Sequence, residues 1–127
     1  MNNPYTLVVG TETSISIKSG DTSSRIQVEL RNPDDSAPIL SSLDVGTIKI
    51  YIQNKKDKTN PIVLSGDIDD VKGVVGFSLE DYSRLTTGAS YKLEVVINYT
   101  SGQVGVYSSS ADFELKVLPS LVRDTYI

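Results

Sequence analysis

Apolar and polar residues alternate strictly over several stretches of this chain, and this pattern constrains its fold more than any other feature. The run 47–53 places three isoleucines on one side and Thr, Lys, Tyr and Gln on the other. Successive side chains of a β-strand point to opposite faces, so such a run predicts a strand with one buried and one solvent-facing side. Further runs of this kind lie at 14–18, 25–31, 75–79, 91–99 and 112–117, and residues 5–9 add a short strand at the start.

The longest run, 91–99, differs from the others because Val96 interrupts its polar side. A strand whose second face is also partly apolar is typical of the middle of a sheet. We therefore expect this run to be a central strand with its outer face partly covered.

Turn-forming residues stand between these runs. Ser-Gly-Asp-Thr occupies 19–22, Asn-Pro-Asp-Asp occupies 32–35, and Thr-Ser-Gly-Gln at 100–103 predicts a tight hairpin. The stretch 79–85 begins with acidic residues and is followed by Thr-Gly, which predicts one short helical connector. Seven or eight short strands joined in this way predict an all-β antiparallel sandwich or small barrel. We place that domain at residues 1–117 and a docking tail at 118–127.

The chain has 127 residues and contains no Cys, His or Trp. Their absence excludes disulfides, the usual zinc ligands, thiol nucleophiles and histidine acid–base chemistry. A chain of this length forms one domain in most cases. We therefore expect a single non-enzymatic domain with no catalytic residue, no cofactor and no metal.

Two sets of acidic residues need separate consideration. Asp67, Asp69 and Asp70 resemble half of an oxygen-rich cation loop, but no bidentate Glu follows them, which favours a solvated turn. Glu29 and Glu94 could form a facing carboxylate pair of the kind that glycosidic cleavage requires. Their separation depends on the fold, so the sequence leaves that pair open.

The net charge of −4 argues against general electrostatic binding to nucleic acid or to an anionic membrane surface. Residues 1–4 lack the features of a signal peptide, and no apolar run approaches the roughly 20 residues that a membrane-spanning helix needs. We expect a chain that is synthesised in the cytoplasm and that binds neither nucleic acid nor membrane.

Apolar residues near both ends of the chain are the candidate partner-binding residues. The tail has no place in the alternating pattern, so its apolar side chains predict docking, either on the domain itself or on another subunit. The candidates are Tyr5, Leu7 and Val9 at one end and Leu118, Leu121, Val122, Tyr126 and Ile127 at the other. Tyr51, on the polar side of its strand, is a possible glycan contact because sugars stack on exposed aromatic rings.

Several motifs follow one another along the chain. A Gly-Asp-Thr turn leads into an alternating strand, and a G-x-V-x-F strand and a hairpin come later. The segments are 17–24, 26–30, 48–52, 73–79, 88–95 and 100–103. Together and in this order, they resemble the N-terminal domain of phage baseplate upper proteins from tailed phages of Gram-positive hosts. The resemblance covers about residues 14–107.

This resemblance implies an immunoglobulin-like sandwich that binds other virion proteins and has no catalytic role. The family's domain continues into a helical linker, which this sequence lacks, so the chain is either a fragment or a small virion protein with another attachment. We expect a virion structural protein that forms a homo-oligomer and contacts neighbouring virion proteins through edge strands and terminal segments. The alternatives are a carbohydrate-binding adhesion module and a capsid decoration or head-fibre base protein.

Overall fold

The computed structural model describes residues 6–8, 14–18, 25–34, 36–56, 61–78, 88–109 and 113–118, and these residues form β-strands without any helix. The strands are β1 (Thr6–Val8), β2 (Ser14–Lys18), β3 (Arg25–Arg31), β4 (Val45–Asn54), β5 (Ile62–Ser65), β6 (Asp67–Asp70), β7 (Val74–Ser78), β8 (Ser90–Tyr99), β9 (Val104–Ser109) and β10 (Glu114–Leu118). The predicted all-β class is confirmed.

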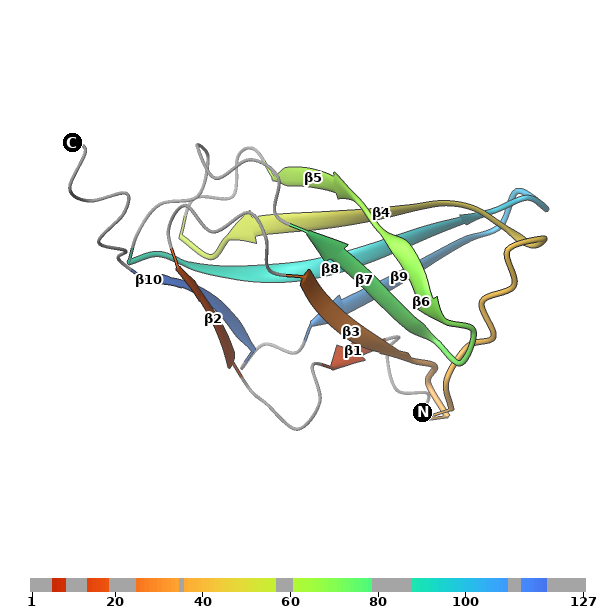
Figure 1. The fold of residues 1–127 in the computed structure, drawn as a ribbon, viewed down its shortest axis with the longest axis horizontal. Helices are drawn as coiled ribbons and strands as arrows, with labels where there is room; N and C mark the ends of the chain where they lie inside the picture. The colour runs from red at the N-terminus through yellow and green to blue at the C-terminus, as the bar shows by residue number, and fades with distance from the viewer. Residues whose placement is uncertain are drawn as a thin grey trace.

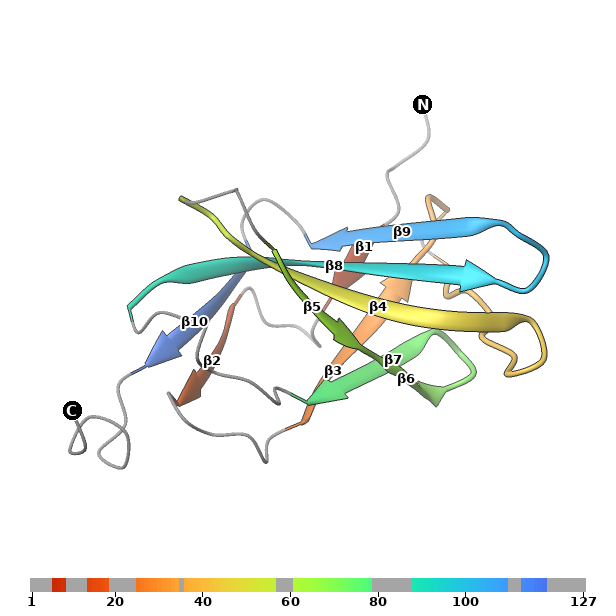
Figure 2. The same cartoon turned by 90° about the horizontal axis from the view of Figure 1, so that it is seen from above.

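The strands form two layers that pack face to face (Figures 1 and 2). Antiparallel pairing joins β3 to β7 and β7 to β6 in one layer, and it joins β5 to β4, β4 to β8 and β8 to β9 in the other. Buried apolar side chains from both layers form a single core. The predicted β-sandwich is therefore confirmed.

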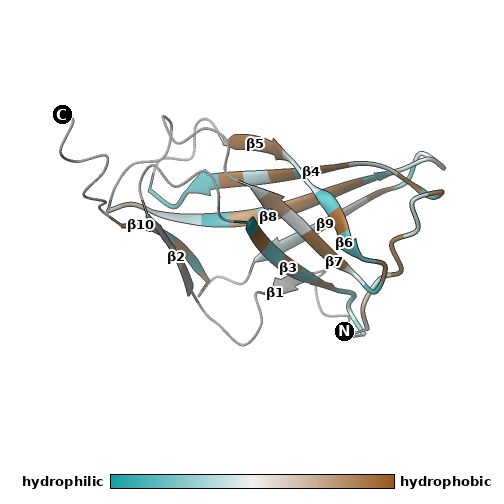
Figure 3. Ribbon diagram, viewed as in Figure 1, coloured by the Kyte–Doolittle hydropathy of each residue, from teal (hydrophilic) through white to brown (hydrophobic). Residues whose placement is uncertain are grey.

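Alternation in the sequence becomes alternation of burial in the strands. Ile48, Ile50 and Ile52 of β4 are buried, as are four inward residues of β8 from Tyr91 to Ile97. Hydrophobic residues accordingly recur along the strands in Figure 3. The strand β8 lies between β4 and β9, as the second apolar face at Val96 predicted. The predicted hairpin at 100–103 joins β8 to β9, with Gly102 at a φ of +94° and Tyr99 N donating to Gln103 O at 2.9 Å.

On each lateral side of the sandwich, one stretch of the chain pairs with strands of both layers. On one side β1 pairs antiparallel with β3 and parallel with β9. On the other side β5 pairs with β4, and after Gly66 the chain continues as β6, which pairs with β7. A Cβ on Gly66 would lie 2.9 Å from Ile48 Cγ2 and 3.1 Å from Ile50 Cδ1, so the crossing requires glycine.

Two strand pairs are parallel, which the prediction of a purely antiparallel sandwich did not include. They are β1 with β9 and β2 with β10. The pair β2–β10 is attached to the start of β8, where Leu115 lies opposite Tyr91. Each parallel pair joins strands that are far apart in sequence, and local alternation carries no information about such pairing.

Ten strands are present where seven or eight were predicted, and one predicted turn is wrong. The segment Asp67–Asp70 is strand β6 and not a solvated turn. Its backbone pairs with β7, and its acidic side chain at Asp69 is held by Arg25 and Gln27. The helical connector predicted at 79–85 lies outside the described residues.

Residues 36–44 run across one end of the sandwich. Leu40 is fully buried there, and its N–H donates to Val71 O at 2.7 Å. At the other end of the segment, Thr100 N donates to Asp44 O at 2.8 Å. The segment thereby ties the β6–β7 turn to the β8–β9 hairpin and closes the core at that end.

Candidate interaction surfaces

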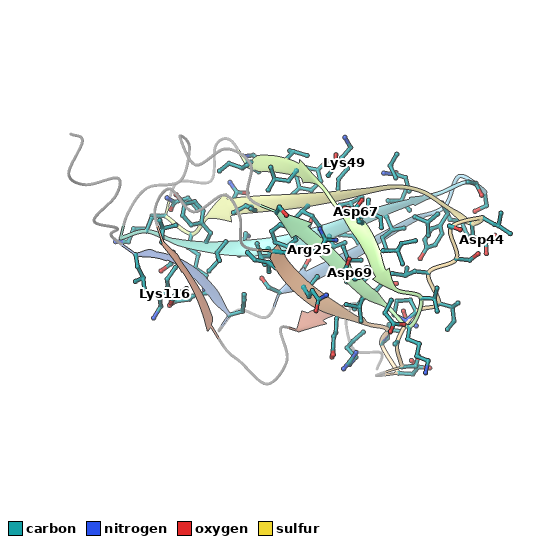
Figure 4. All side chains as sticks on the ribbon, viewed as in Figure 1. Arg25, Asp44, Lys49, Asp67, Asp69 and Lys116 are labelled. Atoms are coloured by element: carbon teal, nitrogen blue, oxygen red, sulfur yellow. The ribbon has the colours of Figure 1, made fainter. Side chains whose placement is uncertain are left out.

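The outer side of β3, β7 and β6 carries a cluster of paired polar residues, Arg25, Gln27, Asp67 and Asp69, which we name the polar face. The Arg25 guanidinium donates from Nη2 to Asp69 Oδ1 at 2.5 Å and from Nε to Oδ2 at 3.2 Å. Gln27 Nε2 donates to the same Oδ2 at 2.8 Å. Figure 4 shows Arg25 and Asp69 pointing toward one another from β3 and β6.

Gly76 of β7 makes this contact between non-neighbouring strands possible. It lies between Gln27 and Asp67 in the strand register. A Cβ at position 76 would lie 2.1 Å from Asp69 Oδ2 and 2.6 Å from Arg25 Nη2. The ion pair therefore passes directly over the β7 backbone. A glycine inside a strand often marks such a close approach, so the sequence did carry this signal.

The polar face contains one positive and two negative side chains, and Arg25 pairs more closely with Asp69 than with the exposed Asp67. The hydrogen bonds from Arg25 hold the pKa of the Asp69 carboxyl below its ordinary value, although burial acts in the opposite direction. The same contact raises the pKa of Arg25. Both Asp69 oxygens accept hydrogen bonds, and no group of three or more metal-ligating side chains lies among the described residues. The contacts of Asp69 join β6 to β3, so this cluster fits a stabilising role better than that of a cation loop.

The opposite outer side, on β5, β4, β8 and β9, has a different character. Val63, Val96, Val104, Val106 and Tyr51 form what we name the valine face. Val96 lies opposite Val106, and Tyr51 lies opposite Val63. Val63, Val104 and Val106 are 45%, 58% and 42% exposed. An outward strip of exposed aliphatic side chains on a sheet is typical of a protein interaction site.

Two exposed lysines lie on the same side of the sheet as the valine face. Lys49 is opposite Val96 in the β4–β8 register, and Lys92 is opposite Gln53. Neither makes a salt bridge with another described residue. Glu94 accepts a hydrogen bond from Ser108 Oγ at 2.9 Å. These two lysines thus have no ionic partner among the described residues, whereas Arg25 of the polar face is paired with Asp69.

Tyr51, the possible glycan contact, is half-buried on the outer side of β4 between Val63 and Glu94. Among the other described tyrosines, Tyr91 and Tyr107 are buried and Tyr99 packs against the core. The described tyrosines therefore do not form an outward row of rings, and Tyr51 and Tyr99 are the two that are only partly buried.

Glu29 and Glu94 do not form a facing pair. Glu29 lies on the outer side of β3, between buried Val28 and Leu30, and Glu94 lies on the outer side of β8. The core separates the two layers, so these carboxylates point away from each other on opposite faces of the sandwich. Glycosidic cleavage by this pair is ruled out by that placement.

The candidate residues near the chain ends fall partly within the described structure. Leu7 lies in β1, which is paired on both edges, so β1 has no free edge to offer a partner strand. Leu118 ends β10 and is 38% exposed. The other candidates lie outside the described residues, and their role stays a prediction: Tyr5, Val9, Leu121, Val122, Tyr126 and Ile127.

A groove beside β4 was not foreseen from the sequence. It measures about 350 Å³ and lies between residues 45–49 of β4 and residues 65–68, where β5 gives way to β6. Ile48 is buried beneath it, while Gly46 and Thr47 are exposed. The groove exists because the chain leaves β4 at Gly66, and that departure depends on tertiary structure.

Comparison with known proteins gives little further information. No protein-family model matches the chain, and no curated protein matches it. Among solved structures, CopC from Methylosinus trichosporium OB3b aligns with 14% identity over 91% of this chain and 94% of that chain, with a TM-score of 0.47. Agreement at this level supports no conclusion about function. Among the described residues there is no helix with the length and hydrophobicity needed to cross a membrane.

Proposed function

We propose that this protein is a structural protein of a phage virion, an immunoglobulin-like module that binds neighbouring virion proteins. The observation that carries the proposal is the unpaired character of the valine face. Three of its valines are exposed, and two lysines beside it have no ionic partner among the described residues. A surface of this kind is explained by binding to another protein.

The strand order supports the immunoglobulin-like part of the proposal. One layer runs β1–β3–β7–β6, and the other runs β5–β4–β8–β9. In the chain order of an immunoglobulin domain, these layers correspond to strands A–B–E–D and C′–C–F–G. The strands β2 and β10 would then be additions to that plan.

The proposed role is assembly without chemistry. Asp69 and Glu29 are held in ion pairs by arginines, and Glu29 and Glu94 lie on opposite faces of the sandwich, which supports a role in binding. The module would be made in the host cytoplasm, form a homo-oligomer and be incorporated into the particle through its valine face and its apolar residues near the chain ends.

Deletion of residues 119–127 tests the assembly role. We expect the variant to fold, because the described residues before position 119 form a continuous core of their own, and to be lost from purified particles. Unchanged incorporation would overturn the role of the tail. The matched control is Ser101→Arg, at the exposed turn between β8 and β9, which should incorporate normally.

Glycan-array binding distinguishes the adhesion alternative from the assembly role. Binding that is lost in Tyr51→Ala and kept in the tail deletion would favour a carbohydrate-binding module. The assembly role predicts no glycan binding by the unaltered chain.

A further inference from the structure

Part of the outer edge of β9 has no partner strand in the described structure. β9 pairs with β8 from Val104 to Ser108. On its other edge, β1 pairs only with Ser108 and Ser109. Residues 104–106 therefore have a described strand on one edge alone, and Figure 2 shows β9 at the border of its layer. An open edge of this kind is a template for an added strand.

The hydrogen bonds of the β8–β9 hairpin determine which backbone groups point toward this edge. Tyr99 N donates to Gln103 O at 2.9 Å, so these two residues are a hydrogen-bonded pair. Hydrogen-bonded and non-hydrogen-bonded pairs alternate along an antiparallel ladder. Val104 and Val106 are therefore in non-hydrogen-bonded pairs with β8, and their N–H and C=O groups point to the open edge. Ser108 is the next residue in this series, and it is where β1 begins to pair.

The open edge carries none of the features that keep sheet edges from pairing. Edge strands commonly carry charged residues or bend away from the sheet. The edge strand β6 contains three Asp, and β5 leads through Gly66 into the other layer. β9 has the uncharged sequence Val-Gly-Val-Tyr-Ser-Ser, and its Val104 and Val106 are 58% and 42% exposed. Pairing with another strand would bury these two side chains.

A second copy of β9 is the strand that fits this edge. In a two-fold symmetric dimer the same surface of each copy meets the other, so a charged strand would face its own charge. β9 has no charged residue and avoids this repulsion. An antiparallel pairing with Val104 opposite Val106 of the second copy uses every outward backbone group of residues 104–106. Each such pair exchanges two hydrogen bonds.

Gly105 lies at the centre of this pairing. It would face Gly105 of the second copy in a non-hydrogen-bonded pair, where the Cα atoms are only about 4.5 Å apart. A glycine within a strand often marks such a close approach of another backbone. A Cβ at this position would also lie 3.2 Å from Tyr107 Cε1. On the outer side, Val104 and Val106 of both copies would form one apolar cluster beside Val96.

We propose that two copies of this chain pair antiparallel through residues 104–106 of β9, with Val104 opposite Val106 and the two-fold axis at Gly105. This inference rests on the proposed assembly function and assigns its homo-oligomer to one edge of the sandwich. The sheets β5–β4–β8–β9 of the two copies become one continuous sheet with both valine faces on the same side. β1 limits the pairing to these residues in each copy.

Introduced cysteines test the register because the chain has none. Chains with Val104→Cys are mixed with chains that carry Val106→Cys and are oxidised mildly. Opposite residues of a hydrogen-bonded pair lie about 5.5 Å apart, within the Cα range of a disulfide, whereas diagonal neighbours lie about 7–8 Å apart. We therefore expect more disulfide-linked dimer in the mixture than in either variant alone. The matched control mixes Val104→Cys with Val63→Cys, 45% exposed on β5, and should give only background.

Equal yields from the mixture and from the single variants would overturn the register. A monomeric mass for the unaltered chain in light scattering, at every concentration tested, would overturn the pairing itself. The variant Val104→Lys should be monomeric, because it places a charge at the edge of each copy, and urea unfolding checks that it is folded. A dimer that persists in folded Val104→Lys would also contradict the inference.

Incorporation into particles is measured separately, so that this inference and the proposed function can fail independently. An unaltered chain that is monomeric in solution but present in particles would refute the β9 pairing and leave the virion function standing. A chain that forms the Val104–Val106 cross-link but is absent from particles would support the pairing and refute the virion function.

Discussion

The two outer faces of the sandwich are built on the same core but manage their exposed groups in opposite ways. On the polar face, Arg25 reaches across β7 to Asp69, so charges from non-neighbouring strands neutralise each other. On the valine face, Val96 and Val106 lie side by side and the nearby Lys49 has no ionic partner among the described residues. The strongest ion pair of the polar face is thus formed within the sandwich, whereas the exposed valines and Lys49 of the other face have no such contact among the described residues.

This difference follows from the residues on the outer side of the middle strand in each layer. Gly76 has no side chain, so the Arg25–Asp69 ion pair can close over the strand. The corresponding middle strand of the other layer, β8, carries Val96 and Glu94 on its outer side, and these side chains keep its surface open. The two faces therefore differ in their exposed groups although they share one core.

The largest effect should come from the shared core and should be the same beneath both faces. Leu30 of β3 and Leu93 of β8 are both almost fully buried. Replacement of either by Ala should lower the free energy of unfolding by about 2–5 kcal/mol. Urea unfolding measures both. A large loss for one variant and none for the other would contradict a core common to the two layers.

The next effect should be confined to the polar face. In Gly76→Ala the new Cβ would lie 2.1 Å from Asp69 Oδ2 and would break the ion pair. We expect the free energy of unfolding to fall by about 1–2 kcal/mol. The control is the same substitution in an Asp69→Asn background, where the loss should shrink. An equal loss in both backgrounds would mean that the ion pair is not its cause.

A pH dependence should follow from the same ion pair. Since the hydrogen bonds from Arg25 lower the pKa of Asp69 below its ordinary 3.8, the folded chain binds this proton less tightly than the unfolded chain. The stabilisation is complete well above pH 3.8 and is lost as the pH falls through the lowered folded value. Asp69→Asn should remove this part of the acid transition, measured by unfolding at several pH values.

Asp34 requires a separate variant in that experiment. A hydrogen bond from the Ser36 hydroxyl also lowers the pKa of Asp34. Asp34 is exposed, so solvent screens its contribution. Asp34→Asn should change the acid transition less than Asp69→Asn. The reverse order would show that the Arg25–Asp69 ion pair is not the main source of the pH dependence.

The smallest effect on stability should come from the valine face. Val104→Thr and Val106→Thr retain the β-branched shape at exposed positions and should change the free energy of unfolding by less than about 0.5 kcal/mol. Their effect should appear in binding, as reduced incorporation into particles. A strong loss of stability would show that these valines serve the fold.

Much of the fold could be predicted from the sequence because alternation directly encodes burial. The isoleucines of β4 and the long run of β8 are examples. Strand β5 was missed because Ile62–Leu64 is continuously apolar, and β6 was missed because its three Asp residues are typical of turns. Those segments are strands because they pair with β4 and β7, and the residues adjacent to them in the sequence do not reveal that pairing.

The surfaces were harder to predict than the strands. The Arg25–Asp69 ion pair requires the β3–β7–β6 register. The groove requires that the chain stop pairing with β4 at Gly66. The placement of Glu29 and Glu94 on opposite faces likewise follows from the order of strands in the layers. Such features depend on which strands pair, and local sequence patterns do not determine that pairing.

The most direct test of the central claim is to determine whether the chain is part of a particle. Virions produced from a genome that encodes a tagged form of the chain would be purified and imaged with a label against the tag. We expect label at one defined location on every particle, and a reduced signal when Val106→Asp disrupts the valine face. Purified particles that lack the chain, although it is abundant in infected cells, would contradict the claim.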